Sequence, residues 1–286
     1  MVQVPPVRHR PDAAREVLGA GVLALECDVS DQAQVERMFD AAVHHFGRVD
    51  ILVNNAGVIQ VGPFESMTVA DFEQAMRIMF WGTVYPTMAV LPHMTGRGDG
   101  RIVNITSIGG KVAVPHLLPY TCAKFAAVGF SEGLRAEMAG KGVKVVTIAP
   151  GLMRTGSYLN ALFKGDHRRE TTWFSIGASV PGFSLSAERA TRRIVNATRR
   201  GDAEKILSAP ASLAARFHGL FPGTTADLLG LVNRLILPTG RNPVGLRGHE
   251  TGALDSAWLS ALTVLGRRAA RRLLERPAPR AVPSRP

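Results

Sequence analysis

Short apolar runs alternate with longer segments of helical period along most of this chain, and this alternation limits its fold more than any other feature. A strand that is apolar along its whole length needs cover on both faces, which helices in the connections provide. Parallel strands joined by crossover helices have this pattern. We therefore predict a doubly wound, Rossmann-like α/β fold with a parallel sheet. The predicted strands are residues 22–25, 49–53, 101–105, 143–148 and 204–207.

Residues that begin or end helices divide the connecting segments. The helix after the first strand ends at Gly47, since glycine commonly terminates helices. A second helix begins at Thr68, where Asp71 completes a capping box, and Pro86 predicts a kink within it. The predicted helices span residues 31–46, 68–91, 120–139 and 186–200.

The pattern changes after residue 208, where helical stretches at 213–218, 226–235 and 257–274 are separated by proline and glycine. We interpret residues 1–208 as a truncated Rossmann-like domain and residues 209–275 as a helical C-terminal extension. Residues 276–286 include four prolines, so we expect this tail to be disordered.

Composition narrows the cellular setting of the chain. None of its apolar runs reaches the roughly 18 unbroken residues that a spanning helix needs. Its first residues lack the apolar core of a signal peptide. Cys27 and Cys122 lie in segments that read as regular structure, so we interpret both as reduced packing residues. These features predict a cytoplasmic protein without a transmembrane segment.

The formal net charge of +11 comes mostly from arginine. One cluster near the C-terminus consists of Arg267, Arg268, Arg271, Arg272, Arg276, Arg280 and Arg285. Such a cluster binds nucleic acid or anionic lipid in some proteins and is a solvated helix face in others. We favour the solvated face and expect no nucleic-acid partner. Salt-sensitive binding that is lost on deletion after Gly266 would indicate the alternative.

One pair of residues carries most of the chemical information. Tyr120 and Lys124 are four apart on a predicted helix, so their polar ends point into the same cleft. A nearby ammonium favours the phenolate and lowers the pKa of a tyrosine. Ser107 follows a predicted strand, at the sheet edge where open α/β folds hold their ligands. Together these residues predict proton exchange with a substrate oxygen.

Four further motifs occur in register with this pair, and together they resemble one family, the short-chain dehydrogenases/reductases. Residues 49–57 (VDILVNNAG) are similar to that family's strand and Asn-Asn-Ala-Gly turn. Asp28 and Val29 resemble its adenine-contacting pair. Residues 104–107 (NITS) resemble its serine strand, and residues 150–155 (PGLMRT) resemble its Pro-Gly turn. The resemblance covers about residues 8–208.

The resemblance implies an oxidoreductase that transfers hydride between NAD or NADP and a carbonyl or alcohol. By that likeness Tyr120 is the general acid/base, Lys124 lowers its pKa and holds the nicotinamide ribose, and Ser107 polarises the carbonyl. Cofactor contacts are implied for Asp28, Val29, Asn54, Asn55, Ala56, Gly57, Pro150, Gly151 and Thr155, besides Tyr120 and Lys124, and no metal is implied. An equal interpretation of Asn54 and Gly57 is that they shape the turn.

Cofactor choice, substrate and assembly are predicted more coarsely. Arg8 and Arg10 fit a 2′-phosphate, so NADP is slightly favoured, and ordinary solvated charge is the alternative. Residues 152–185 are expected to form a lid over a small-molecule, apolar carbonyl or alcohol substrate. The side chains expected in this lid are Tyr158, Leu159, Leu162, Phe163, Trp173 and Phe174. Small residues in 120–139 predict a homo-oligomer contact.

Two departures from the family pattern stand beside these matches. The family begins with a strand, a glycine-rich loop and a helix that receives the pyrophosphate, and no glycine cluster precedes Asp28. We expect that Met1 is a misassigned start or a truncation, and that loss of this central strand leaves apolar sheet edges unpaired. Met79 stands where the family usually has asparagine, which predicts weakened turnover. The alternative function is a non-catalytic or truncated member that binds a partner through its basic C-terminal helices.

Overall fold

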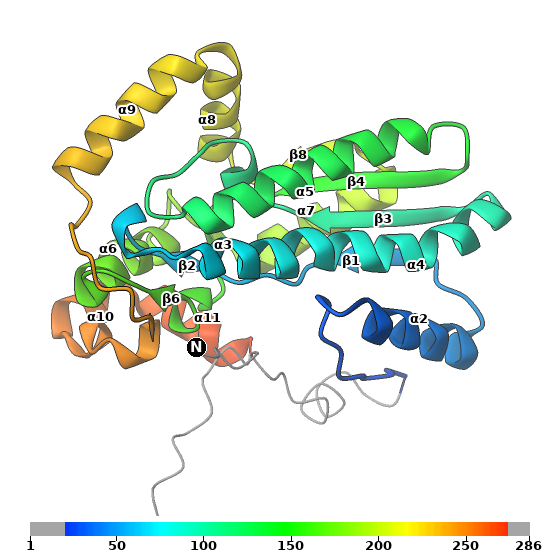
Figure 1. Ribbon diagram of the computed structural model, residues 1–286, viewed down its shortest axis with the longest axis horizontal. Helices are drawn as coiled ribbons and strands as arrows, with labels where there is room; N and C mark the ends of the chain where they lie inside the picture. The colour runs from blue at the N-terminus through cyan, green and yellow to red at the C-terminus, as the bar shows by residue number, and fades with distance from the viewer. Residues whose placement is uncertain (1–20, 274–286) are drawn as a thin grey trace, which may run out of the picture.

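The computed structural model describes residues 21–273 (Figure 1). The predictions made for Arg8, Arg10 and the tail at 276–286 lie outside the described residues. Within the part that is described, no helix combines the length and the hydrophobicity needed to cross a bilayer.

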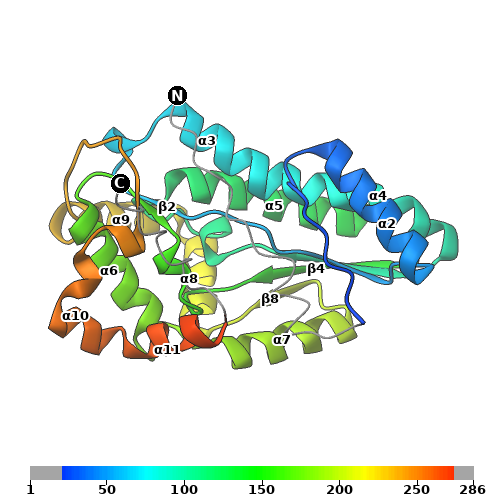
Figure 2. The same cartoon turned by 90° about the horizontal axis from the view of Figure 1, so that it is seen from below.

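A four-stranded parallel sheet forms the centre of the fold, in the order β1-β3-β4-β8. Its strands are β1 (Ile51–Asn54), β3 (Gly100–Ile105), β4 (Val143–Ala149) and β8 (Glu204–Ile206). Helices α4 and α5 cover one face and α7 covers the other, as Figure 2 shows. This arrangement confirms the doubly wound α/β class, since both faces of the apolar strands are covered.

The sheet is flanked by helices close to the predicted bounds. These are α2 (Gln32–Phe46), α3 (Val69–Ala75), α4 (Gly82–Arg97), α5 (Leu118–Glu137) and α7 (Ala187–Arg200). Gly47 ends α2 in the left-handed region, and Thr68 and Asp71 form the predicted capping box. Ser186 caps α7 at its start, and Gly201 ends it.

One prediction about regular structure is wrong, and the second predicted helix has an interruption that the sequence did not predict. Residues 22–25 form no strand, because among residues 21–273 no strand pairs with that segment. The second helix is interrupted at Met76–Trp81, which form a π-helical segment, and α4 continues through Pro86, where the kink stays a prediction. Pro86 lacks the N–H that would bond to the Gly82 carbonyl, and the wider turns end just before that position.

One edge of the sheet is apolar. Strand β1 pairs with β3 on one side, and no other strand of residues 21–273 lies on its second side. Ile51 is 48% exposed and Val53 is 51% exposed. The prediction of an unpaired apolar edge is therefore met at β1 within the described residues.

A buried row of polar side chains crosses the sheet. Asn54 pairs in register with Asn104, and Asn104 pairs with Thr147 on the next strand. The Asn54 amide donates to Asn104 at 2.9 Å and to Thr87 of α4 at 3.1 Å. The Asn104 amide donates to Ser131 of α5 at 2.9 Å, and Ser131 is 2.7 Å from the Thr147 hydroxyl. This row fixes both helices on the sheet, since each buried polar group has a partner.

Residues 152–185 and the end of the described chain build a second, smaller core. Short strands β2 (Gln60–Val61), β6 (Leu162–Phe163) and β9 (Leu246–Arg247) form one sheet, while β5 (Met153–Arg154) and β7 (Leu185–Ser186) form another. Helices α6 (His167–Ser179), α10 (Ala257–Leu262) and α11 (Val264–Arg272) pack around them. The helix α11 lies so close that a Cβ added to Gly156 would be 2.2 Å from the Ala270 Cβ.

Three of the side chains predicted for the lid belong to the second core instead. Tyr158, Phe163 and Phe174 are almost fully buried together in this second core, so they are packing residues. Their burial arises because β9 and the last helices cover the segment from outside. Leu159 and Trp173 are partly exposed at the border of the same cluster.

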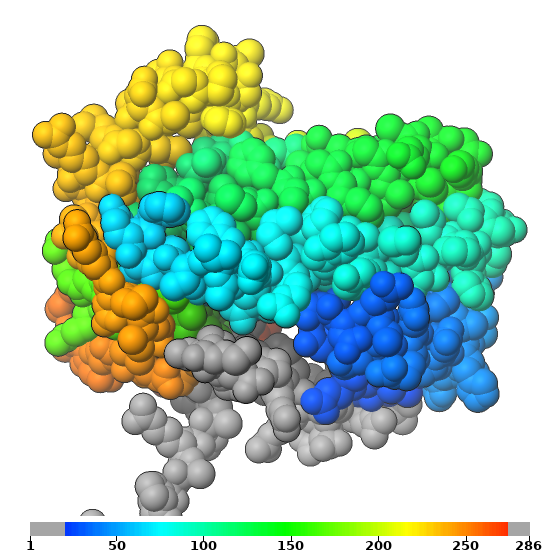
Figure 3. Space-filling view, viewed as in Figure 1, coloured from blue at the N-terminus to red at the C-terminus, as the bar shows by residue number. Residues whose placement is uncertain are grey.

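Two helices stand apart from this arrangement. Helices α8 (Ala209–Leu220) and α9 (Pro222–Leu235) form a hairpin that projects from the body, drawn in yellow in Figures 1 and 3. The predicted helical extension therefore consists of a projecting hairpin followed by a segment that packs back on the domain.

Candidate active site

Ser107 lies directly beyond the carboxyl end of β3. Its hydroxyl accepts a hydrogen bond from the Gly109 N–H at 3.0 Å and so caps the short helical turn Ile108–Gly110. The Ile108 N–H donates to the Pro150 carbonyl at 2.7 Å, which ties this turn to the end of β4. The serine is buried, and the turn that it caps is held by this backbone hydrogen bond beyond the ends of β3 and β4.

The turn after Ser107 packs directly on helix α5. A Cβ added to Gly109 would be 3.1 Å from the Tyr120 ring, and one added to Gly110 would be 2.6 Å from the Lys124 carbonyl oxygen. Only residues without a side chain allow this approach. The two glycines therefore bring Ser107, Tyr120 and Lys124 to one place, as the sequence predicted.

The electrostatics of Tyr120 differ from the prediction. Burial raises the pKa of the Tyr120 phenol, and a hydrogen bond with Ser107 offsets only part of that effect. The Lys124 ammonium lies over the tyrosine ring, 5.8 Å from its centroid, and donates to the Ile105 carbonyl at 2.8 Å. Burial lowers the pKa of Lys124 to about 8. The predicted lowering of the Tyr120 pKa by Lys124 is therefore wrong for this geometry.

Met79 occupies the space beside the lysine. It is 1% exposed and packs with Ala75 and Ala123. A Cβ added to Gly57 would be 3.7 Å from the Met79 sulfur and 3.9 Å from the Lys124 Nζ, so both groups border the same glycine. The Met79 carbonyl accepts a 2.8 Å hydrogen bond from Thr83. The side chain offers only a weak acceptor next to the ammonium.

The residues after β1 divide into two groups. Asn54 is buried in the polar row across the sheet, which supports its interpretation as a structural residue. Asn55, Ala56 and Gly57 are exposed at the carboxyl end of the strand. Ligands of open α/β sheets bind at this edge.

The other predicted contacts lie on neighbouring elements. Asp28 is exposed before α2, where its carboxylate accepts from the Ser30 N–H at 2.9 Å. Val29 packs so tightly on α4 that a Cβ added to Gly82 would be 2.7 Å from its Cγ2.

Residues 150–155 lie beyond β4. Pro150 is buried, and Gly151 faces Ser208, whose hydroxyl would be 2.9 Å from an added Cβ. The Thr155 hydroxyl accepts from the Ser157 N–H at 3.3 Å. Cys122 is exposed rather than packed, which corrects its interpretation as a packing residue.

The described residues fit the nicotinamide half of a dinucleotide. Lys124 is a buried ammonium whose one described acceptor is the Ile105 carbonyl, and an ammonium has three donors. Its remaining donors suit ribose hydroxyls, and Ser107 and Tyr120 lie beside it. The family's glycine-rich phosphate loop would lie before Asp28. Most of that segment lies outside the described residues.

Sequence reasoning missed one buried network near Tyr120. The His116 Nδ1 is 2.7 Å from a carboxylate oxygen of Glu170, and the second oxygen accepts from the Trp173 indole at 2.7 Å. Glu170 is fully buried, and His116 has a left-handed backbone with φ of 63°. No local pattern predicts this pairing, because the two partners come from distant parts of the sequence.

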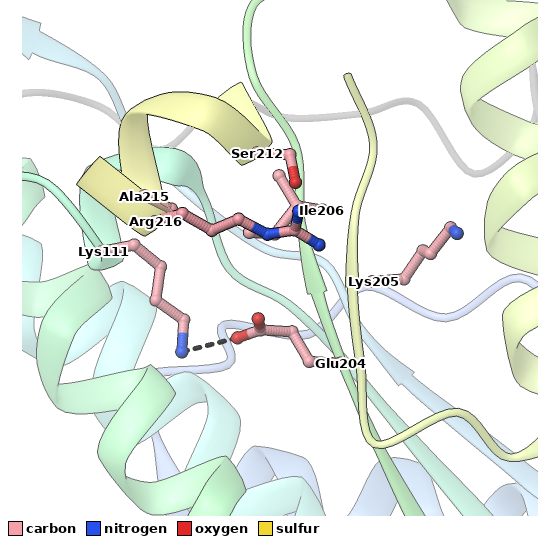
Figure 4. Close-up of a pocket in the computed structure, with 7 residues that line it drawn as sticks. All are labelled: Lys111, Glu204, Lys205, Ile206, Ser212, Ala215 and Arg216. Carbon is pink, nitrogen blue, oxygen red and sulfur yellow. Dashed lines mark ion pairs between the residues drawn. The ribbon is translucent and has the colours of Figure 1, made fainter. Parts of the chain in front are cut away.

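A polar pocket lies between β8 and α8. It has a volume of about 370 Å³, and Figure 4 shows Lys111 paired with Glu204 inside it. The Lys111 Nζ is 2.5 Å from the Glu204 carboxylate, and Arg216 extends from α8 across the same space. None of the predicted site residues lines this pocket.

Comparison with known proteins agrees with this geometry. The family profile for short chain dehydrogenases matches residues 6–161. A putative oxidoreductase, SadH, from Mycobacterium tuberculosis is 37% identical over 200 residues, which are 68% of this chain and 71% of SadH. The chain belongs to the short-chain dehydrogenase family.

Other members of the short-chain dehydrogenase family support the assignment. A D-threitol dehydrogenase from Mycolicibacterium smegmatis is 41% identical over 129 residues, or 45% of this chain and 50% of that protein. The crystal structure of a short-chain dehydrogenase from Streptomyces avermitilis superposes with a TM-score of 0.65 at 27% identity, covering 79% of this chain and 86% of that one. The predicted family, fold and oxidoreductase class are confirmed.

Proposed function

We propose that this short-chain dehydrogenase transfers hydride between NAD(P) and an apolar carbonyl or alcohol, with Tyr120 as the general acid/base. The observation that carries the proposal is the meeting of Ser107, Tyr120 and Lys124 beyond the carboxyl end of β3. Ser107 polarises the substrate oxygen, and Lys124 holds the nicotinamide ribose.

The raised pKa of Tyr120 bears on the direction of proton transfer. When bound, NAD(P) supplies or accepts the hydride at the substrate carbon. A raised pKa keeps the phenol protonated, so Tyr120 is suited to donate its proton to the oxygen of a carbonyl that is being reduced. Ser107 hydrogen-bonds with the phenol and so positions it.

An apolar substrate is supported by the surroundings of Tyr120. Its ring packs at the border of the second core together with Val114, Leu152 and Trp173, which are all partly buried. An apolar ligand that contacts these side chains would be bound through the area that it removes from water. We propose NADP rather than NAD on the basis of Arg8 and Arg10, and a cytoplasmic homo-oligomer.

One observation favours a second function, a non-catalytic member that binds a partner through its basic C-terminal helices. Met79 places a thioether where a stronger hydrogen-bond acceptor near Lys124 would serve proton relay. The two functions differ in whether Tyr120 matters for turnover.

The experiment measures NADPH and NADH binding by fluorescence and turnover on a panel of apolar ketones. The enzyme function predicts binding and turnover, and Tyr120→Phe should lower kcat by about a hundredfold or more while binding persists. A chain that binds neither cofactor supports the second function. Turnover that Tyr120→Phe leaves unchanged would remove Tyr120 from the mechanism.

A further inference from the structure

His116 lies just before helix α5, close to the proposed general acid/base. Leu117 is the N-cap residue of α5, and Tyr120 lies in the first turn of that helix. The His116 carbonyl accepts a hydrogen bond from the Gly62 N–H at 2.9 Å, and its backbone has a left-handed φ of 63°. This conformation is uncommon outside glycine, and such residues cluster at functional sites. The fold therefore holds His116 in an unusual conformation four residues before Tyr120.

One ring nitrogen of His116 is held by a buried carboxylate. The Nδ1 atom is 2.7 Å from Glu170 of α6, and Glu170 is 0% exposed. A carboxylate only accepts hydrogen bonds, so Nδ1 donates to it. The indole of Trp173 donates to the same carboxylate and packs edge to face on the His116 ring, with the centroids 6.5 Å apart. These contacts fix the orientation of the imidazole ring.

The other ring nitrogen of His116 is open. Within residues 21–273, Nε2 has no hydrogen-bond partner, although the residue is only 6% exposed. The fold does not enclose this atom completely. Most buried polar atoms have a partner in the protein or in ordered water. An open nitrogen on a fixed ring is therefore free to bind a ligand.

The surroundings of His116 connect it to the proposed substrate site. Leu117 belongs to the second core, and Tyr120 and Trp173 pack at the border of the same cluster. His116 adjoins Leu117 in the chain and contacts Trp173 through its ring. Small-molecule sites combine apolar walls with a few fixed polar groups that select the ligand. His116 provides such a polar group beside the apolar side chains around Tyr120.

We propose that the His116 Nε2 binds a hydroxyl group of the substrate, which is then an apolar ketone that carries a hydroxyl, or the corresponding diol. This inference rests on the proposed function, in which Ser107 and Tyr120 hold the reacting oxygen. A hydroxyl both donates and accepts hydrogen bonds, so it fits Nε2 in either protonation state of the ring. Glu170 acts through His116 and is a positioning residue.

The test compares cyclohexanone with its 2-, 3- and 4-hydroxy derivatives, in which the hydroxyl lies at different distances from the carbonyl. Turnover with NADPH gives kcat/KM, and quenching of tryptophan fluorescence in the presence of NADP gives the affinity. We expect one hydroxy isomer to exceed cyclohexanone by roughly tenfold or more in both measurements, because it gains a hydrogen bond in a site shielded from water.

Two variants separate the nitrogens of His116. The amide nitrogen of asparagine is two bonds from Cβ, as Nδ1 is, and asparagine tolerates a left-handed backbone. His116→Asn therefore keeps the donor to Glu170, removes Nε2, and should abolish the preference for the hydroxy isomer. The amide nitrogen of glutamine is three bonds from Cβ, as Nε2 is, so His116→Gln should keep part of the preference. His249→Asn is the matched control and should keep all of it, because the His249 Nδ1 contacts the Leu159 carbonyl at 2.9 Å in the second core.

Circular dichroism should show that the variants retain the fold. The inference is overturned if the unaltered chain prefers no hydroxy isomer, a result that needs no variant, or if His116→Asn keeps the preference. Equal turnover of all four ketones would leave the proposed function in place and remove His116 from substrate binding. Selective binding of one hydroxy isomer that is lost in His116→Asn, without turnover of any ketone, would support His116 and contradict the proposed function.

Discussion

The ammonium of Lys124 donates a 2.8 Å hydrogen bond to the carbonyl of Ile105, the last residue of the strand that leads to Ser107. This contact joins helix α5 to the carboxyl end of β3. It also buries a cation whose pKa is lowered to about 8. The lysine is therefore costly to the fold at neutral pH, and this cost is measurable.

Lys124→Met should change how stability depends on pH. Burial lowers the folded-state pKa to about 8, whereas the unfolded-state pKa is about 10.4. Below pH 8 the folded protein carries the full cost of the buried charge, and above about 10.4 the cost disappears. Between pH 8 and about 10.4, urea unfolding should show that the free energy of unfolding of the wild type rises by about 3 kcal/mol relative to that of the variant. The exposed Lys141→Met serves as control, and parallel curves for wild type and Lys124→Met would refute the account.

Gly110→Ala should destabilise the protein by about 2 kcal/mol or more. Its added methyl would lie 2.6 Å from the Lys124 carbonyl oxygen, which belongs to the backbone and moves only with the helix. Gly129→Ala in the same helix meets nothing within 4 Å and should stabilise by about 1 kcal/mol. Thermal unfolding of the two variants checks the opposite signs. Equal effects would show that the turn and the helix are not in direct contact.

The polar row across the sheet should behave as one unit. Ser131→Ala removes the acceptor of the Asn104 amide and the partner of Thr147, at a cost of about 1–3 kcal/mol. Thr147→Val should cost about 1–2 kcal/mol. A double-mutant cycle should give a coupling of roughly 0.5 kcal/mol or more, because both changes break the same contact. Strict additivity would mean that the two hydroxyls act separately.

Glu170→Ala should be strongly destabilising, by about 3–5 kcal/mol. The change leaves the His116 ring nitrogen and the Trp173 indole without their buried acceptor. Glu137→Ala, at an exposed position on α5, should stay within about 0.5 kcal/mol of the wild type. A small effect at Glu170, measured by urea unfolding, would show that the buried network adds little to stability.

Met79→Asn should raise kcat of the full chain with little change in KM, because an amide beside Lys124 offers an acceptor for proton relay that the thioether lacks. The variant should also lose stability, since Met79 is 1% exposed. Met138→Asn tests the same change in another buried cluster and should lower stability without raising kcat. Steady-state kinetics on both variants separate the two effects, and an unchanged rate in Met79→Asn would argue against a relay at this position.

The sheet and its helices were predictable because their signals are local. Apolar runs mark β3 and β4, and residues such as Gly47 and the Thr68–Asp71 box mark helix ends within a few positions of each other. The grouping of Ser107, Tyr120 and Lys124 followed from helical spacing and a strand end, with the resemblance in support, and the close approach of Gly110 explains it physically. The roles of these side chains remain predictions.

The parts that were not predictable depend on distant contacts. Residues 22–25 are apolar enough for a strand, yet a strand exists only with a partner. The raised pKa of Tyr120 depends on how deeply α5 is covered, which no spacing in the sequence reports. Tyr158 and Phe163, predicted for the lid, are buried in the second core because β9, far along the chain, pairs with β6.

That last pairing sets an order for synthesis. Strand β6 is translated long before its partner β9. Gly156 is likewise translated long before Ala270 of α11, which packs against it. Strand β8 is the last described strand of the central sheet in chain order. A chain folds from its N-terminal end as it is synthesised, so the central sheet can form once β8 has left the ribosome. The second core is therefore completed last, and a nascent chain that stalls after α9 would expose its apolar side chains to chaperones and proteases.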